Sequence, residues 1–156
     1  MNIVLLTAAG AGVRMHQDIP KQFLHVDNRP IIIHTMEAFQ AHPNIDAIIV
    51  VTIESWSEVV WAYAKQFNIT KLRWVVPGGD TGQDSIRNGL YALKKEFPQE
   101  EIVVTIHDGN RPLVTAEIIS DSLATYAKYG NAVAVIPCTE VVFESEDGYS
   151  SCRSTE

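Results

Sequence analysis

Residues 3–12 read Ile-Val-Leu-Leu-Thr-Ala-Ala-Gly-Ala-Gly, a short aliphatic run that passes directly into a loop of small residues. The run is continuous rather than alternating, which is typical of a parallel strand covered on both faces. Small residues after such a strand let backbone N–H groups come close to phosphate oxygens. This stretch therefore predicts an α/β fold with a loop for a phosphorylated ligand.

Further aliphatic runs at residues 47–51, 74–76, 102–106 and 132–136 alternate with segments that are apolar at helical spacing. This alternation predicts a doubly wound, mostly parallel sheet with right-handed crossovers. Pro30, Asp84 and Thr115 are expected at helix starts, and Gly130 at a helix end. The apolar stripes are interpreted as core: Ile33, Met36 and Phe39; Trp56, Val59, Val60, Tyr63 and Phe67; Ile86, Leu90, Leu93 and Phe97; Ile119, Leu123 and Tyr126.

The sequence changes character after Pro137. Residues 140–144 have the pattern of a strand, and residues 146–148 have the composition of a turn. We therefore expect an α/β core over residues 1–137 and a C-terminal β-hairpin arm over residues 138–156.

Composition indicates an ordinary folded protein, with 46% hydrophobic residues and a net charge of −7 from 19 acidic and 12 basic residues. A negative field repels nucleic acid and anionic membranes, so neither is expected as a partner. The apolar start is too short to span a bilayer. Cys138 and Cys152 lack zinc or redox spacing, which favours a cytoplasmic enzyme with reduced thiols.

The first loop places two cations, Arg14 and Lys21, after its glycines. Met15 stands where a dinucleotide-binding motif has its third glycine, and no Gly-Lys-Ser/Thr follows as in a P-loop. A purely structural turn is the alternative reading. The long irregular run to Lys21, broken by Pro20, favours a cradle for a triphosphate because a structural turn passes into its helix sooner.

Two more loops carry polar residues after predicted strands, and ligands of such sheets gather at the carboxyl ends of the strands. Residues 77–85 suit recognition of a base or ribose, or they merely turn the chain and cap a helix through Asp84 and Ser85. In residues 107–115, Asp108 suits Mg²⁺ or ligand hydroxyls and Arg111 suits a phosphate. A plain surface pair between these two is the alternative reading.

Taken together, residues 8–15, 20–23, 78–90 and 107–112 resemble the cytidylyltransferase family that includes the 2-C-methyl-D-erythritol 4-phosphate and ribitol-5-phosphate enzymes. The resemblance implies a Rossmann-like nucleotidyltransferase domain, CTP as donor, Mg²⁺ as metal and a homodimer. The residue expected to hold this Mg²⁺ is Asp108, because of its place just after a predicted strand. By this resemblance, Ala8, Ala9, Gly10 and Gly12 hold the triphosphate, Arg14 and Lys21 stabilise the transition state, Gly79, Asp80 and Ser85 read cytosine and ribose, and Asp108, Gly109 and Arg111 contact ligand hydroxyls, nucleotide or the acceptor phosphate.

The expected reaction transfers CMP from CTP to a polyol or sugar-alcohol phosphate, in an isoprenoid-precursor or cell-surface polymer pathway. Gly82, residues 109–110 and residues 139–141 depart from the family pattern, mainly on the acceptor side. The family continues past the region matching Glu156, so we expect residues 138–156 to begin a longer region and the chain to bind nucleotide better than it completes the reaction. The alternatives are a sugar-phosphate or molybdenum-cofactor nucleotidyltransferase and a nucleotide-binding fragment without turnover.

Overall fold

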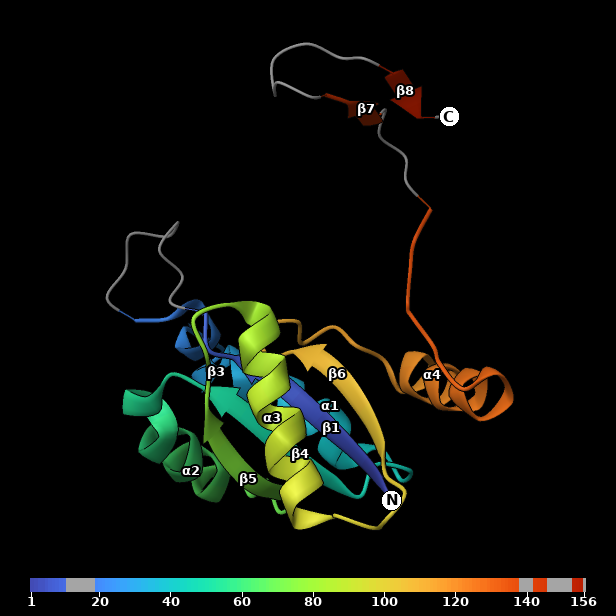
Figure 1. Cartoon of the computed structure of the whole chain (residues 1–156). Helices are drawn as coiled ribbons and strands as arrows, with labels where there is room; N and C mark the ends of the chain where they lie inside the picture. The colour runs from blue at the N-terminus through green and yellow to red at the C-terminus, as the bar shows by residue number, and fades with distance from the viewer. Residues whose placement is uncertain (11–18, 138–141, 146–152, 156) are drawn as a thin grey trace. The chain divides into compact units, whose positions relative to one another are not determined.

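The computed structural model describes residues 1–10, 19–137, 142–145 and 153–155. The chain divides into two compact units, residues 1–121 and 122–156, which are described separately. The first unit is built on a four-stranded parallel sheet in the order β5-β4-β1-β6 (Figure 1). Its strands are β1 (Asn2–Ala8), β4 (Ala47–Thr52), β5 (Leu72–Pro77) and β6 (Val103–Asp108). The predicted doubly wound, mostly parallel sheet is therefore confirmed.

The two central strands, β1 and β4, are buried along almost their whole length because helices cover both faces of the sheet (Figure 1). Alternate residues of a strand point to opposite faces. One face packs in a cluster with Leu93 of α3 (Gly82–Glu96), and Ile3, Leu5, Ile49 and Val51 are its central members. The opposite face lies over α1 (Ile31–Ala41), whose predicted core residues Ile33, Met36 and Phe39 are fully buried.

Helix α3 differs from its predicted form at both its start and its buried face. The residue before it, Thr81, is the N-cap, and its hydroxyl accepts a hydrogen bond from the Asp84 N–H at 3.1 Å. Asp84 lies within the first turn, so the expectation that it caps the helix was wrong. The buried face runs through Ser85, Gly89 and Leu93, while Leu90 is 36% exposed. Gly89 shifts the face because its missing side chain lets the helix approach Leu5.

The other elements mostly begin and end as expected. Pro30 directly precedes α1, Thr115 Oγ1 accepts a hydrogen bond from Ile118 N–H at the start of α4 (Ala116–Tyr129), and Gly130 has a φ of +80°. The remaining elements are η2 (Lys21–Phe23), β2 (His25–Val26), β3 (Arg29–Pro30), η3 (Glu54–Trp56) and α2 (Ser57–Gln66).

One predicted strand is absent. Residues 131–137 have no regular secondary structure, and Val133, Val135 and Ile136 are 82%, 81% and 89% exposed. A β-branched run forms a strand only where it packs and pairs with a neighbour, and this run has no hydrogen-bonded neighbour in the described part of the chain. The expectation of a strand at residues 132–136 was therefore wrong.

The second unit contains a small antiparallel pair. Strand β7 (Val142–Glu144) pairs with β8 (Arg153–Thr155), with Phe143 opposite Ser154. The predicted turn at residues 146–148 lies outside the described residues, so the hairpin arm as a whole and the boundary at residue 137 remain predictions.

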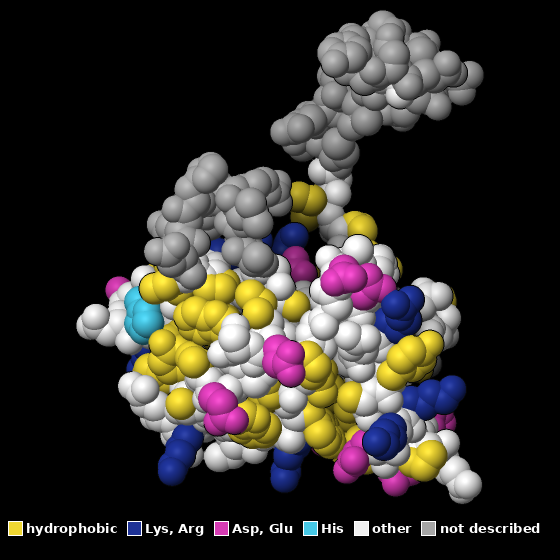
Figure 2. Space-filling model, turned by 60° about the vertical axis from the view of Figure 1, so that its left-hand side comes forward, with side chains coloured by type: hydrophobic (Ala, Val, Ile, Leu, Met, Phe, Trp, Pro, Cys, Tyr) yellow, Lys and Arg dark blue, Asp and Glu magenta, His cyan; other side chains and the backbone are white. Residues whose placement is uncertain are grey.

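Charged side chains are mixed rather than grouped on the face of the molecule in Figure 2. The Lys and Arg side chains on this face are separated by acidic and apolar ones. No helix among the described residues has the length and apolar character needed to cross a membrane.

Candidate functional site

The carboxyl ends of the four strands lie at one edge of the sheet. Ala8 of β1 is in register with Thr52 of β4, Thr52 with Pro77 of β5, and Thr7 of β1 with Asp108 of β6. The three loops expected to carry the site begin directly after these residues. The prediction that they meet at this edge is therefore confirmed.

The first loop leaves β1 at Ala8, which is buried, and reaches the exposed Gly10. It returns through Pro20 to Lys21 in η2, where Lys21 is partly exposed. Phe23 anchors this return because its ring is 1% exposed and stacks on Trp56 with the centroids 4.3 Å apart. Two predicted site residues, Gly12 and Arg14, lie outside the described residues.

The second loop packs tightly against the first. Gly78 N–H donates to Thr52 O at 2.8 Å, which continues the pairing of β5 with β4 by one residue. A Cβ atom added at Gly78 would lie 2.3 Å from the Ala9 Cβ. Since non-bonded carbon atoms essentially never approach this closely, the absence of a side chain at Gly78 is what lets the two loops touch here.

A hydrogen-bonded network fixes the second loop to the start of α3. Ser85 is 3% exposed, and its hydroxyl accepts from Gly79 N–H at 3.1 Å and donates to Thr81 O at 3.0 Å. Ser85 thus holds the backbone of Gly79 and Thr81 against the first turn of α3. Asp80, by contrast, is exposed at the surface of the loop.

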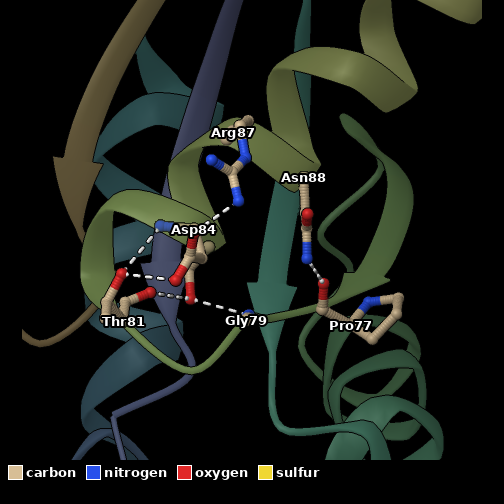
Figure 3. Close-up of polar contacts among 7 residues, drawn as sticks. Pro77, Gly79, Thr81, Asp84, Arg87 and Asn88 are labelled. Atoms are coloured by element: carbon tan, nitrogen blue, oxygen red, sulfur yellow. Dashed lines mark hydrogen bonds and ion pairs between the residues drawn. The ribbon is translucent and has the colours of Figure 1, made fainter.

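The carboxylate of Asp84 belongs to the same network (Figure 3). Thr81 Oγ1 donates to one carboxylate oxygen at 2.7 Å and Arg87 donates to the other at 2.5 Å, and Figure 3 shows these side chains pointing toward one another. The hydrogen bond from Thr81 lowers the pKa of Asp84 below its ordinary value, and the charge of Arg87 acts in the same direction. The capping role predicted as one alternative for this loop therefore belongs to Thr81 and not to Asp84.

The third loop is held to β1. Gly109 N–H donates to Thr7 O at 2.8 Å, and Thr35 Oγ1 of α1 donates to Gly109 O at 2.9 Å. A Cβ added at Gly109 would lie 3.1 Å from Thr7 O and 3.4 Å from the Ala8 Cβ, so glycine keeps the third loop close to the first. Gly109 is therefore packed beside Ala8.

Asp108 and Arg111 form an ion pair at the surface of this loop. Arg111 Nε donates to Asp108 Oδ2 at 2.6 Å, and the two side chains are 73% and 47% exposed. Thr7 Oγ1 donates to the other oxygen, Asp108 Oδ1, at 3.1 Å. The guanidinium has five N–H donors, so this pair leaves Arg111 with donors for an anionic ligand. His107 donates from Nε2 to Arg111 O at 2.9 Å, which fits a structural histidine.

The donor set at this edge fits a magnesium ion only if a ligand supplies most of the coordination. No group of three or more His, Cys, Asp or Glu that fits a metal was found within the described residues. Asp108 contributes a single carboxylate, with both oxygens already accepting one hydrogen bond. Mg²⁺ is commonly held by one or two carboxylates together with substrate phosphates. The residues therefore fit a Mg²⁺ that arrives with a phosphorylated ligand.

Comparison with known proteins agrees with this geometry. A family model described as IspD, 2-C-methyl-D-erythritol 4-phosphate cytidylyltransferase, matches residues 2–153. The chain belongs to this family. The resemblance found in the sequence is thus confirmed over nearly the whole chain.

Curated relatives of this cytidylyltransferase-family chain carry two different names. A ribitol-5-phosphate cytidylyltransferase of Lacticaseibacillus paracasei is 42% identical over 146 residues, covering 94% of this chain and 62% of that protein. One from Vibrio parahaemolyticus is 43% identical over 150 residues, covering 94% and 63%. A 2-C-methyl-D-erythritol 4-phosphate cytidylyltransferase of Clostridium botulinum is 41% identical over 150 residues, covering 96% and 64%. The family member described here spans less than two thirds of the length of each.

Solved structures support the fold assigned to this family member. A 4-diphosphocytidyl-2C-methyl-D-erythritol synthase superposes with a TM-score of 0.75 at 21% identity, covering 99% of this chain and 68% of that one. A second, from Anaerococcus prevotii, has a TM-score of 0.76 at 24% identity, covering 99% and 63%.

Three residues of the family member's site were not predicted from the sequence: Thr7, Gln22 and Thr35. Thr7 and Asp108 lie at the carboxyl ends of the neighbouring strands β1 and β6, so knowledge of the strand register would have paired them. Gln22 lies within the motif at residues 20–23, but no local signal shows that its side-chain Nε2 donates a hydrogen bond to Ala8 O. Thr35 lies among the apolar residues of α1, where a single hydroxyl gives no indication of a distant partner.

Proposed function

We propose that this chain transfers CMP from CTP to a phosphorylated polyol, giving a CDP-alcohol and pyrophosphate. The observation that carries the proposal is the meeting of three loops at one sheet edge, with Gly78 and Gly109 each packed against the Ala8–Gly10 segment. Membership of the cytidylyltransferase family supports CTP as the donor. The two names among the relatives support either ribitol 5-phosphate or 2-C-methyl-D-erythritol 4-phosphate as the acceptor.

The proposed chemistry is an in-line displacement at the α-phosphorus of CTP. An oxygen of the acceptor phosphate forms the new P–O bond while the bond to the bridging oxygen of the β-phosphate breaks and pyrophosphate leaves. A phosphate oxygen is already ionised near neutral pH, so the protein needs no general base. Catalysis then consists of positioning and charge neutralisation.

Each loop has a separate task in this proposal. Backbone N–H groups of Ala8, Ala9, Gly10 and Gly12 bind the triphosphate, and the cations Arg14 and Lys21 neutralise the charge that grows on the leaving pyrophosphate. The second loop, shaped by Ser85 and Gly79 and exposing Asp80, reads cytosine and ribose.

The third loop serves the acceptor and the metal. Gly109 borders the nucleotide, Arg111 binds the acceptor phosphate, and Asp108 holds Arg111 and Mg²⁺. A bound Mg²⁺ supplies charge neutralisation to the phosphates of the nucleotide. A homodimer, in which Arg111 serves the neighbouring subunit, is part of the same proposal and predicts a dimer by light scattering.

The test is a panel of CTP, ATP, GTP and UTP, each with Mg²⁺ and with either ribitol 5-phosphate or 2-C-methyl-D-erythritol 4-phosphate. Pyrophosphate release measures turnover, and mass spectrometry identifies the product. We expect pyrophosphate and a CDP-alcohol only from CTP with one of the acceptors. Equal turnover with ATP would favour a different sugar-phosphate nucleotidyltransferase, and tight CTP binding without product would favour a nucleotide-binding protein.

A further inference from the structure

Gln22 lies buried at the end of the first loop, and its side chain reaches back to the start of that loop. It is 2% exposed, and its Nε2 donates to Ala8 O at 2.5 Å and to Gly10 O at 3.3 Å. A primary amide carries two N–H donors, so one group serves both carbonyls. Because both partners are acceptors, the amide nitrogen must be the atom that faces them.

The Ala8 carbonyl is held from a second direction by Thr52. The Thr52 hydroxyl lies 3.4 Å from Ala8 O, and Thr52 is fully buried. A trans peptide holds its C=O and the following N–H antiparallel. Fixing the Ala8 carbonyl therefore also fixes the Ala9 N–H, which points away from Gln22. That N–H is one of the groups assigned to the triphosphate in the proposed function.

Gln22 directly follows Lys21 in the chain. Lys21 begins the η2 turn, in which Phe23 N–H donates to Pro20 O at 2.9 Å, and the two residues that follow Lys21 are both buried. Gln22 joins this turn to Ala8, 14 residues earlier in the chain. The separation between the Lys21 backbone and the glycine loop thus depends on the Gln22 amide.

We propose that Gln22 is a positioning residue that ties the two ends of the triphosphate loop together, so that the loop amides and the Lys21 ammonium face the same phosphates. At 2% exposure Gln22 has almost no surface for a ligand, so it acts through Ala9, Gly10 and Lys21. That the ligand is a triphosphate rests on the proposed function. The tie, meaning the hydrogen bonds from Gln22 to Ala8 and Gly10, does not depend on that function and can be measured without any nucleotide.

The variant that tests the tie is Gln22→Met, which keeps the length of the side chain and removes both N–H donors. Gln40→Met is the matched control. Gln40 also bonds to backbone, since its Nε2 donates to Asn68 O at 3.3 Å and its Oε1 accepts from Lys71 N–H at 2.9 Å. These partners precede β5 and lie at the amino end of the sheet, away from the three loops.

Hydrogen exchange of the ligand-free full chain is the first measurement. Gln22→Met should speed exchange of the backbone amides of Ala8, Ala9 and Gly10 and of residues 21–24, whereas Gln40→Met should leave them unchanged. CTP binding is the second measurement, and Gln22→Met should weaken it about tenfold because the backbone at Ala8 and Gly10 is then no longer held by the Gln22 amide. Turnover should fall further, by about 10²-fold, since misplaced charge affects the transition state most.

The two failures are distinguishable. If the wild-type chain neither binds CTP nor releases pyrophosphate, the proposed function fails, while the exchange result still decides whether the tie exists. Unchanged exchange in Gln22→Met would overturn the tie. CTP binding that falls no more in Gln22→Met than in Gln40→Met would overturn its role in positioning.

A measurement on the wild type covers the case in which Gln22→Met does not fold. The side-chain NH₂ protons of Gln22 should exchange with water far more slowly than those of Gln66 and Gln83, which are exposed. Exchange as fast as that of Gln66 would overturn the proposal. Gln22→Glu adds a second variant, because its carboxylate places a charged acceptor against two carbonyls and should disturb the loop at least as much as Gln22→Met.

Discussion

The hydroxyl of Thr7 donates a hydrogen bond to Asp108 Oδ1 across 3.1 Å and thereby joins two residues that are 101 positions apart in the chain. These residues are in register on the neighbouring strands β1 and β6. The contact orients the Asp108 carboxylate, whose other oxygen accepts from Arg111. It thus connects the end of β1, from which the first loop leaves, to the ion pair of the third loop.

Replacing Thr7 with Val should test this connection, because valine keeps the shape of threonine and removes the donor. We expect the free energy of unfolding to fall by about 1 kcal/mol, the typical contribution of one such hydrogen bond. Urea denaturation measures it. Thr7→Ser keeps the hydroxyl and should preserve the ion-pair geometry; equal losses in both variants would show that packing of the methyl group matters instead.

Lys21→Ala should lower turnover much more than stability. In the proposed function the Lys21 ammonium acts where negative charge grows, and loss of one such group typically reduces the rate about 10²–10³-fold. Lys21 is partly exposed, so the unfolding temperature should change little. Lys65→Ala, on the exposed side of α2, is the control. Near-normal turnover in Lys21→Ala would refute the catalytic role.

Gly89→Ala should destabilise the fold although alanine favours helices. An added Cβ would lie 2.6 Å from Leu5 Cδ1 and 2.8 Å from Val51 Cγ2. Overpacking of this kind costs about 1–3 kcal/mol, which outweighs the gain in helix propensity of about 1 kcal/mol. Gly82→Ala in the same helix meets no atom within 4 Å and should be neutral or stabilising in thermal denaturation. Equal effects of the two changes would contradict the packing of α3 described here.

The ionised Asp84 carboxylate should add to the free energy of unfolding of the wild type, and this contribution should be lost in acid. The variant Asp84→Asn has no such contribution to lose. The folded-state pKa of Asp84 lies below its ordinary value of 3.8, chiefly because Thr81 donates to the carboxylate and secondarily because Arg87 is near. A lowered pKa stabilises the fold above pH 3.8, and this contribution disappears as the pH falls through the folded-state value. Denaturation of both proteins between neutral and acidic pH measures it.

The causes of the shift can be separated by an NMR titration of the Asp84 carboxyl group. Thr81→Val should raise its pKa more than Arg87→Gln does, because the hydrogen bond is the larger cause. The reverse order would show that the charge of Arg87 dominates.

The sequence predicted the sheet and the edge at which the loops meet, but it could not identify every partner. Continuous aliphatic runs marked β1 and β4 because both strands are buried on two faces. The run at residues 132–136 is also aliphatic, yet composition does not show whether a neighbouring strand is available. The loops were placed correctly because carboxyl ends of parallel strands share one edge.

Errors in detail came from choices that local pattern leaves open. Thr81 and Asp84 are both suitable caps, and the helix begins early enough to use Thr81. The buried face of α3 includes Gly89 because the helix lies too close to Leu5 for a side chain at this position. The contact from Gln22 to Ala8 joins a side chain to a distant backbone carbonyl, a relationship that depends on the folded path and has no sequence spacing of its own.

The central claim is that the carboxyl edge of the sheet binds CTP, and a titration of the ¹⁵N-labelled chain with CTP and Mg²⁺ tests it most directly. We predict the largest changes in amide chemical shift at Ala9, Gly10, Lys21, Gly79, Ser85 and Gly109, with smaller changes for ATP at equal concentration. Lys65, Asn68 and Thr70 should not respond, because they lie before β5 at the opposite end of the sheet. Changes centred on those three residues, or equal responses to ATP and CTP at the carboxyl edge, would contradict the account.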